Sequence, residues 1–106
     1  MILVASVMHT GTLFTMRRLL AGRDVDQCHF TTEKQGRMTK LTEDAEQVVI
    51  PLRHPARCLE TFKRRNKEYD SFAEQWNNML ERAKSMNPHY IHIDDIDRRD
   101  KEAERS

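Results

Sequence analysis

The stretch that decides the fold is Ile2-Leu3-Val4-Ala5-Ser6-Val7, which runs into Met8-His9-Thr10-Gly11-Thr12. An unbroken apolar run of this kind, with β-branched residues, is typical of a central strand covered on both faces. Beyond Gly11, apolar side chains recur at helical spacing, and Gly22 stands where a helix-ending glycine is expected. The sequence therefore predicts a strand over 2–7, a turn at Gly11 and a helix over 12–21.

The turn between this strand and this helix predicts an anion site. Backbone N–H groups and the positive end of the helix dipole converge on one small volume there. Gly11 allows close approach of the backbone, and Thr10 and Thr12 offer hydroxyl donors, so phosphate or sulfate is the expected ligand. In the alternative interpretation a threonine merely caps the helix. The Walker A pattern is absent, because Thr12 and Leu13 follow Gly11 where Gly-Lys-Ser/Thr would end that motif.

Further along the chain, predicted strands alternate with predicted helices. The polar stretch over 32–46 is interpreted as a flexible loop, a hairpin excursion or a short helix near its end. Ser71 and Glu74 have the spacing of a capping box. The other elements are a weak strand over 25–31, a strand over 47–52, a helix over 55–68, a helix from Ser71 to about Asn87 and a strand over 89–93. The alternation predicts a three-layer α/β fold, with a small, mainly parallel sheet flanked by helices.

Composition narrows the class of protein. The 106 residues suit a single domain over 1–106, and 18 basic against 17 acidic residues give no field that favours extended nucleic acid. Cys28 and Cys58 have no metal-type spacing, and neither do His89 and His92, so we expect reduced thiols, no metal and a cytoplasmic location. No run reaches membrane-spanning length, and the apolar start lacks the basic flank of a signal peptide.

A second motif lies in Val48-Val49-Ile50-Pro51-Leu52-Arg53-His54-Pro55, where a strand delivers an arginine to its carboxyl end as a helix begins. Thr61 follows eight residues after Arg53. This segment resembles the 3′-phosphate-binding segment of sulfotransferases that use 3′-phosphoadenosine 5′-phosphosulfate (PAPS). The stretch 8–14 is similar to the 5′-phosphosulfate loop of that family. Residues 71–83 and 90–96 are similar to its later helix and strand.

The resemblance implies a P-loop-like fold and a transferase that binds PAPS, or its bisphosphate product, and passes sulfuryl to an acceptor of unknown identity. It assigns the 5′-phosphosulfate to His9, Thr10, Gly11, Thr12 and Leu13, and the 3′-phosphate to Arg53 and Thr61. His9 stands where the family usually has a lysine or arginine that stabilises the departing phosphate, so His9 is a candidate catalytic residue. Only about 25 residues separate the first helix from the strand before Arg53, where family members usually carry acceptor-binding residues.

Four further residues bear on the chemistry. His29, near the end of the weak strand, is the candidate general base for the acceptor hydroxyl, with Glu33 as the alternative. Asp94 and Asp95 follow an apolar strand and could hold magnesium, which would favour a divergent P-loop nucleotide kinase. A third hypothesis is a non-catalytic interaction module built on the same fold.

Overall fold

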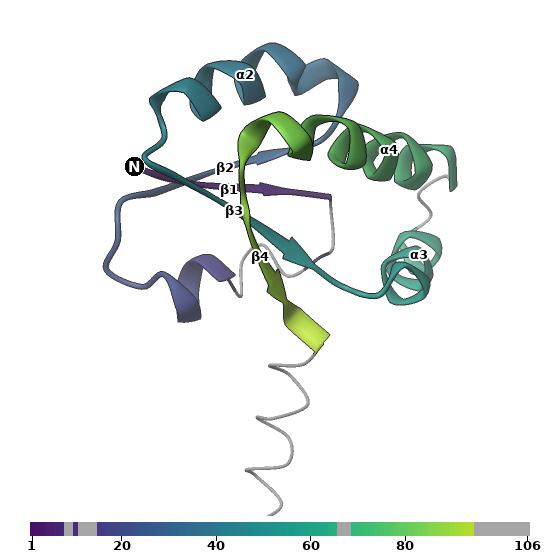
Figure 1. The fold of residues 1–106 in the computed structure, drawn as a ribbon. Helices are drawn as coiled ribbons and strands as arrows, with labels where there is room; N and C mark the ends of the chain where they lie inside the picture. The colour runs from purple at the N-terminus through teal and green to yellow at the C-terminus, as the bar shows by residue number, and fades with distance from the viewer. Residues whose placement is uncertain (8–9, 11–14, 66–68, 95–106) are drawn as a thin grey trace, which may run out of the picture.

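The computed structural model describes residues 1–7, 10, 15–65 and 69–94 of the chain (Figure 1). Four strands form one sheet in the order β2-β1-β3-β4, and every neighbouring pair is parallel. Their bounds are Ile2–Ser6 for β1, Val25–His29 for β2, Gln47–Leu52 for β3 and His89–His92 for β4. The predicted α/β class, the parallel sheet and the pairing of the first strand with the third are thereby confirmed.

Strand β1 lies inside the sheet and sets the register of its neighbours. It pairs with β2 from Ile2 opposite Val25 to Ser6 opposite His29. Its pairing with β3 ends at Val4 opposite Val49. Pro51 lies beyond that last pair, near the end of β3, but it still stands opposite Ile91 in the pairing with β4.

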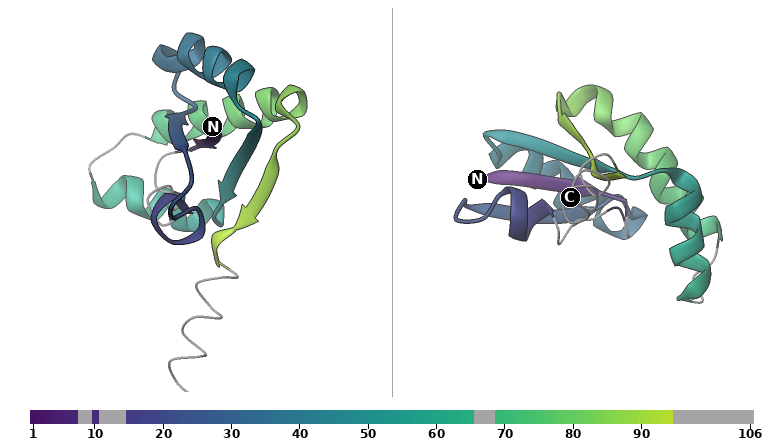
Figure 2. Two further views of the ribbon diagram at one scale, coloured as in Figure 1. Left: turned by 90° about the vertical axis from the view of Figure 1, so that its left-hand side faces the viewer. Right: turned by 90° about the horizontal axis from the view of Figure 1, so that it is seen from below.

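Helices and turns cover both faces of the sheet. The helices α2 (Gln35–Asp44) and α4 (Tyr69–Met86) lie over one face, and a short π-type turn, η1 (Thr15–Leu19), lies against the other (Figures 1 and 2). The helix α3 (Pro55–Arg64) follows β3 at the carboxyl end of the sheet. This arrangement gives the three layers that the alternation of elements predicted.

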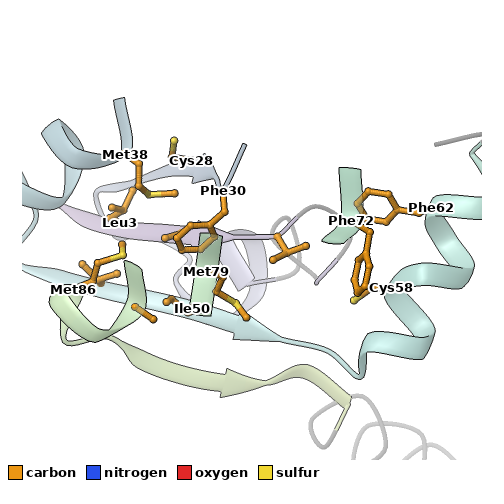
Figure 3. Packing of buried hydrophobic residues seen from close by; sticks show 14 residues of the cluster. Leu3, Cys28, Phe30, Met38, Ile50, Cys58, Phe62, Phe72, Met79 and Met86 are labelled. Carbon is orange, nitrogen blue, oxygen red and sulfur yellow. The ribbon is translucent and has the colours of Figure 1, made fainter. Parts of the chain in front are cut away.

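The core lies between the sheet and the two helices above it (Figure 3). Leu3 and Ile50 point from the strands toward this layer, where they meet Met38 of α2 and Met79 of α4. The contact between α3 and α4 is aromatic, with the rings of Phe62 and Phe72 edge to face at a centroid distance of 5.6 Å. Edge-to-face packing contributes about 0.5–1.5 kcal/mol beyond the apolar area that it buries.

Of the three alternatives for 32–46, the flexible loop and the hairpin are wrong. This stretch forms a helical turn, η2 (Thr32–Lys34), followed by the helix α2, which is longer than the short helix that was the third alternative. Met38 is buried in the core, and Leu41 and Ala45 pack against it. This apolar stripe is narrow and the rest of the segment is polar, so the helical pattern is hard to recognise in the sequence. Packing against the sheet stabilises the helix although its own pattern is weak.

The predicted capping box at Ser71 is also wrong. Helix α4 begins at Tyr69, so Ser71 is already helical, and its hydroxyl accepts a hydrogen bond from the Gln75 side chain. The Glu74 carboxylate instead accepts from the N–H (3.1 Å) and the hydroxyl of Thr32. Glu74 therefore ties α4 to the turn that precedes α2.

The helix predicted over 12–21 is present only as η1 within the residues that the structure describes, and 12–14 lie outside them. The N–H of Leu20 donates to the carbonyl of Thr15 (3.0 Å) and closes this turn. Leu19, one of the apolar residues at helical spacing in this stretch, is exposed. Gly22 ends the segment with a φ of 79°, as we predicted for this glycine.

Candidate functional site

The candidate site is the edge of the sheet where all four parallel strands end. The chain leaves β1 toward β2 on one side and returns past β1 to β3 on the other, so the direction of winding reverses between β1 and β3. Ligands of open α/β sheets bind outside the carboxyl ends of the strands at this kind of reversal. Arg53 directly follows β3, and the segment after Ser6 leaves the neighbouring strand at the same edge.

The predicted 5′-phosphosulfate loop lies mostly outside the described residues, namely at His9, Gly11, Thr12 and Leu13. Thr10 is described and is almost fully buried, with 1% of its surface exposed. Its hydroxyl donates to the carbonyl of Val7 at 2.7 Å. The hydroxyl of Thr10 therefore already donates its hydrogen to the backbone. An anion bound after β1 would have to accept hydrogen bonds from other groups.

Arg53 and Thr61, the predicted 3′-phosphate ligands, lie on either side of the start of α3. Arg53 is half-buried directly after β3. Thr61 lies about 9 Å along the helix axis from Pro55, at a rise of about 1.5 Å per residue. Its hydroxyl donates to the Arg57 carbonyl (3.2 Å) and lies 3.4 Å from a donor nitrogen of Arg64. A phosphate shared by both residues requires the Arg53 side chain to extend along α3.

A carboxylate already sits at the N-terminus of α3. One oxygen of Asp94 accepts from the backbone N–H of His54 (2.7 Å), and the other pairs with the Arg57 guanidinium (2.6 Å). Burial raises the pKa of Asp94, but these two hydrogen bonds and the charges of Arg57 and Arg53 outweigh it and hold the pKa below its usual value. Asp94 is thus a fixed negative charge beside the candidate phosphate ligands.

The first backbone donors of α3 are also occupied. Pro55 has no N–H, and the N–H of Ala56 donates to the His54 ring (3.2 Å). The N–H groups of Arg57 and Cys58 donate to the His54 carbonyl at 3.0 and 3.2 Å. An anion at Arg53 would therefore be held by side chains, and the free N–H groups that usually bind anions at a helix start contribute little.

The predicted base, His29, ends β2 directly opposite Ser6 of β1. Its Nδ1 lies 3.1 Å from the Ser6 hydroxyl oxygen and 3.3 Å from the Ser6 carbonyl oxygen. When Nδ1 carries the hydrogen, the carbonyl accepts it and Nε2 is the nitrogen that takes up a proton, as a general base requires. Ser6 is fully buried and was not singled out in the sequence, because only the register between β1 and β2 brings it to His29.

The described residues offer no group of three or more His, Cys, Asp or Glu side chains that could hold a metal ion. Both oxygens of Asp94 are engaged by His54 and Arg57, which weighs against its predicted role as a magnesium ligand. Cys28 and Cys58 are buried thiols that are not joined in a disulfide. Burial raises the pKa of the Cys58 thiol to about 11, against a smaller lowering effect of Arg53, and it also raises the pKa of Cys28.

One feature of this edge was missed in the sequence. Trp76 is half-buried and lines an open groove beside Arg53. The signal was the spacing of Trp76, Leu80 and Lys84, four residues apart, which places them in one row along α4.

No protein family model, curated protein or solved structure matches this chain. Within the residues that the structure covers, no helix is long and apolar enough to cross a membrane.

Proposed function

We propose that this chain binds an adenine nucleotide that carries 5′- and 3′-phosphate groups, either PAPS or its bisphosphate product, and transfers sulfuryl to an acceptor hydroxyl. In this proposal the segment from His9 to Leu13 holds the 5′-phosphosulfate, and Arg53 with Thr61 holds the 3′-phosphate. The planar guanidinium of Arg53 can form two parallel charge-assisted hydrogen bonds with one phosphate.

The observation that supports the proposal is the adjacency of β1 and β3. Parallel neighbours lie about 4.8 Å apart, so the segment after β1 and Arg53 leave the sheet side by side. The two motifs with family resemblance, which are about 40 residues apart in the sequence, thus start from neighbouring strands at one edge. A nucleotide with phosphates at both ends of its ribose can span this separation.

The proposed reaction is a direct displacement at sulfur. The acceptor oxygen forms a bond to the sulfur, the bond from sulfur to the 5′-phosphate oxygen breaks, and the bisphosphate leaves with the electron pair. His29 takes the proton of the acceptor hydroxyl, with Ser6 holding its Nδ1 side. His9, when protonated, would offset the charge that develops on the departing phosphate.

A thermal-unfolding titration tests the binding step. A ligand that binds the folded state raises the unfolding temperature, so we compare adenosine 3′,5′-bisphosphate, ATP with magnesium and inorganic sulfate. We expect the bisphosphate to give the largest rise. Arg53→Ala should remove most of that rise, whereas Arg37→Ala should not, because Arg37 pairs with Asp26 on an exposed part of the surface. An equal response of both variants, or a larger response to ATP with magnesium, would contradict the proposal.

A further inference from the structure

An open groove of about 720 Å³ lies between α4 and the end of the sheet. Its apolar wall is formed by side chains from β3, α4 and β4, namely Leu52, Trp76, Met79, Leu80, Ala83 and Tyr90. Ligand sites for small molecules usually measure about 300–1,000 Å³ and are mainly apolar, with a few polar groups. The groove therefore has the size and the lining of a binding site.

The groove exists because α4 carries two rows of apolar side chains. One row, which includes Phe72, Met79 and Ala83, packs into the core. In the neighbouring row, Trp76 rests against Phe72 with a centroid distance of 5.8 Å and an interplanar angle of 31°. Leu80, four residues further on, is 54% exposed.

The strand across the groove leaves a second large side chain in solvent. Tyr90 of β4 is 49% exposed and lines the same groove as Leu80 and Trp76. In the residues that the structure describes, β4 is the last strand of the sheet, so no further strand covers this side. Apolar surface gathered in one concave place is typical of a site that another molecule covers.

The charges around the groove favour an anion. Among the described residues that line it, Arg53 and Lys84 contribute positive charge and Asp94 contributes negative charge. Asp94 is already neutralised by Arg57 and by the N–H of His54. Lys84 is a cation of the groove that the nucleotide proposal does not use.

We propose that this groove binds a small planar aromatic group joined to an anionic group, such as an aromatic sulfonate or carboxylate. The ring covers Trp76, Leu80 and Tyr90, and the anionic group is attracted by Lys84. This proposal does not depend on the nucleotide. It is argued from the lining of the groove alone. The test of the groove and the test of nucleotide binding can therefore give different outcomes.

Fluorescence tests the proposal directly, because Trp76 is the only tryptophan of the chain and lines the groove. The probes are 8-anilinonaphthalene-1-sulfonate and its uncharged analogue N-phenyl-1-naphthylamine. We expect the sulfonate to bind at one equivalent, to quench Trp76 by energy transfer and to raise the unfolding temperature. We expect it to bind at least several-fold more tightly than the uncharged analogue.

Three variants locate the binding. Leu80→Glu should weaken both probes by about tenfold or more, because it removes apolar surface and adds a negative charge. Lys84→Gln should remove the preference for the sulfonate and leave the uncharged probe unaffected. Leu19→Glu is the matched control, because Leu19 is also exposed but does not line the groove, and it should change neither affinity.

Several results would overturn the proposal. One is an unchanged affinity in Leu80→Glu, and another is equal affinity for the two probes in the wild-type chain. A third is a fall in the unfolding temperature with the sulfonate, which would mean that the probe binds unfolded chains. Leu80 is largely exposed, so its variant should fold, and the circular dichroism of each variant checks this.

Discussion

At the scale of single residues, Asp94 has the greatest influence on the candidate site. It follows β4 but acts on α3, where it accepts hydrogen bonds from the His54 N–H and the Arg57 guanidinium. A nucleotide phosphate at Arg53 would therefore meet a carboxylate that already shares the same positive field. This arrangement sets a limit on the affinity of the site for anions.

Asp94→Asn should raise the affinity for adenosine 3′,5′-bisphosphate about two- to tenfold, because it removes a negative charge near the phosphate. The kinase hypothesis expects the opposite result, namely the loss of a magnesium-dependent response. Isothermal titration with each ligand distinguishes them. Unchanged bisphosphate affinity would show that Asp94 is remote from the bound phosphate.

The same variant should reduce the free energy of unfolding by about 1 kcal/mol at neutral pH. Because folding lowers the pKa of Asp94, its stabilisation is fully present above the unfolded pKa of about 3.9 and is lost as the pH falls through the lower folded value. Urea unfolding at several pH values should show the two chains converge in acid. Asp26→Asn, in the looser 3.4 Å pair with Arg37, is the matched control and should cost less.

At the scale of elements, the strands and α3 could be predicted closely and α2 could not. The runs at Ile2 and Val48 are apolar on both faces, so their burial is visible in the sequence. Helix α2 has a narrow apolar stripe around Met38 and Leu41, and it forms because the sheet beneath supplies its partners. For the site, Arg53 could be located at a strand end, but the Asp94 contact depends on long-range packing and was missed.

Two glycines test the conformations of these elements. Gly36 lies inside α2 and Gly22 has a φ of 79°, and at both positions an added Cβ would meet nothing within 4 Å. Gly36→Ala should therefore raise the free energy of unfolding by about 0.5–1 kcal/mol, because alanine favours the helix. Gly22→Ala should lower it by about 1 kcal/mol, because alanine disfavours a positive φ.

Urea unfolding followed by circular dichroism measures both glycine variants under the same conditions. The pair is matched because contact with neighbouring atoms is absent in both cases and only the backbone angle differs. A destabilised Gly36→Ala chain would contradict the helical assignment of 35–44, and a neutral Gly22→Ala chain would contradict the left-handed conformation there.

At the scale of the whole molecule, one buried cluster joins α2, α3, α4 and the sheet. Cys28 of β2 and Cys58 of α3 belong to this cluster at different places, and neither is in a disulfide. They therefore report whether the two parts of the core open together. The predicted single domain requires that they do.

Iodoacetamide labelling at pH 8 should be very slow in the folded protein, since a pKa of about 11 leaves about one Cys58 thiol in a thousand ionised. With increasing urea, both cysteines should become labelled with one midpoint, which mass spectrometry can follow for each peptide. Labelling of Cys58 at clearly lower urea than Cys28 would show that α3 separates from the rest before global unfolding.

The place of β1 inside the sheet has a consequence for the nascent chain. Its apolar strand is synthesised before its partners β2 and β3, which are about 23 and 45 residues further along. Parallel pairing over such separations closes long loops and is slow. Until β3 has been synthesised, β1 exposes apolar surface and has one neighbouring strand at most. We therefore expect chaperones that bind short apolar stretches to recognise β1 during translation.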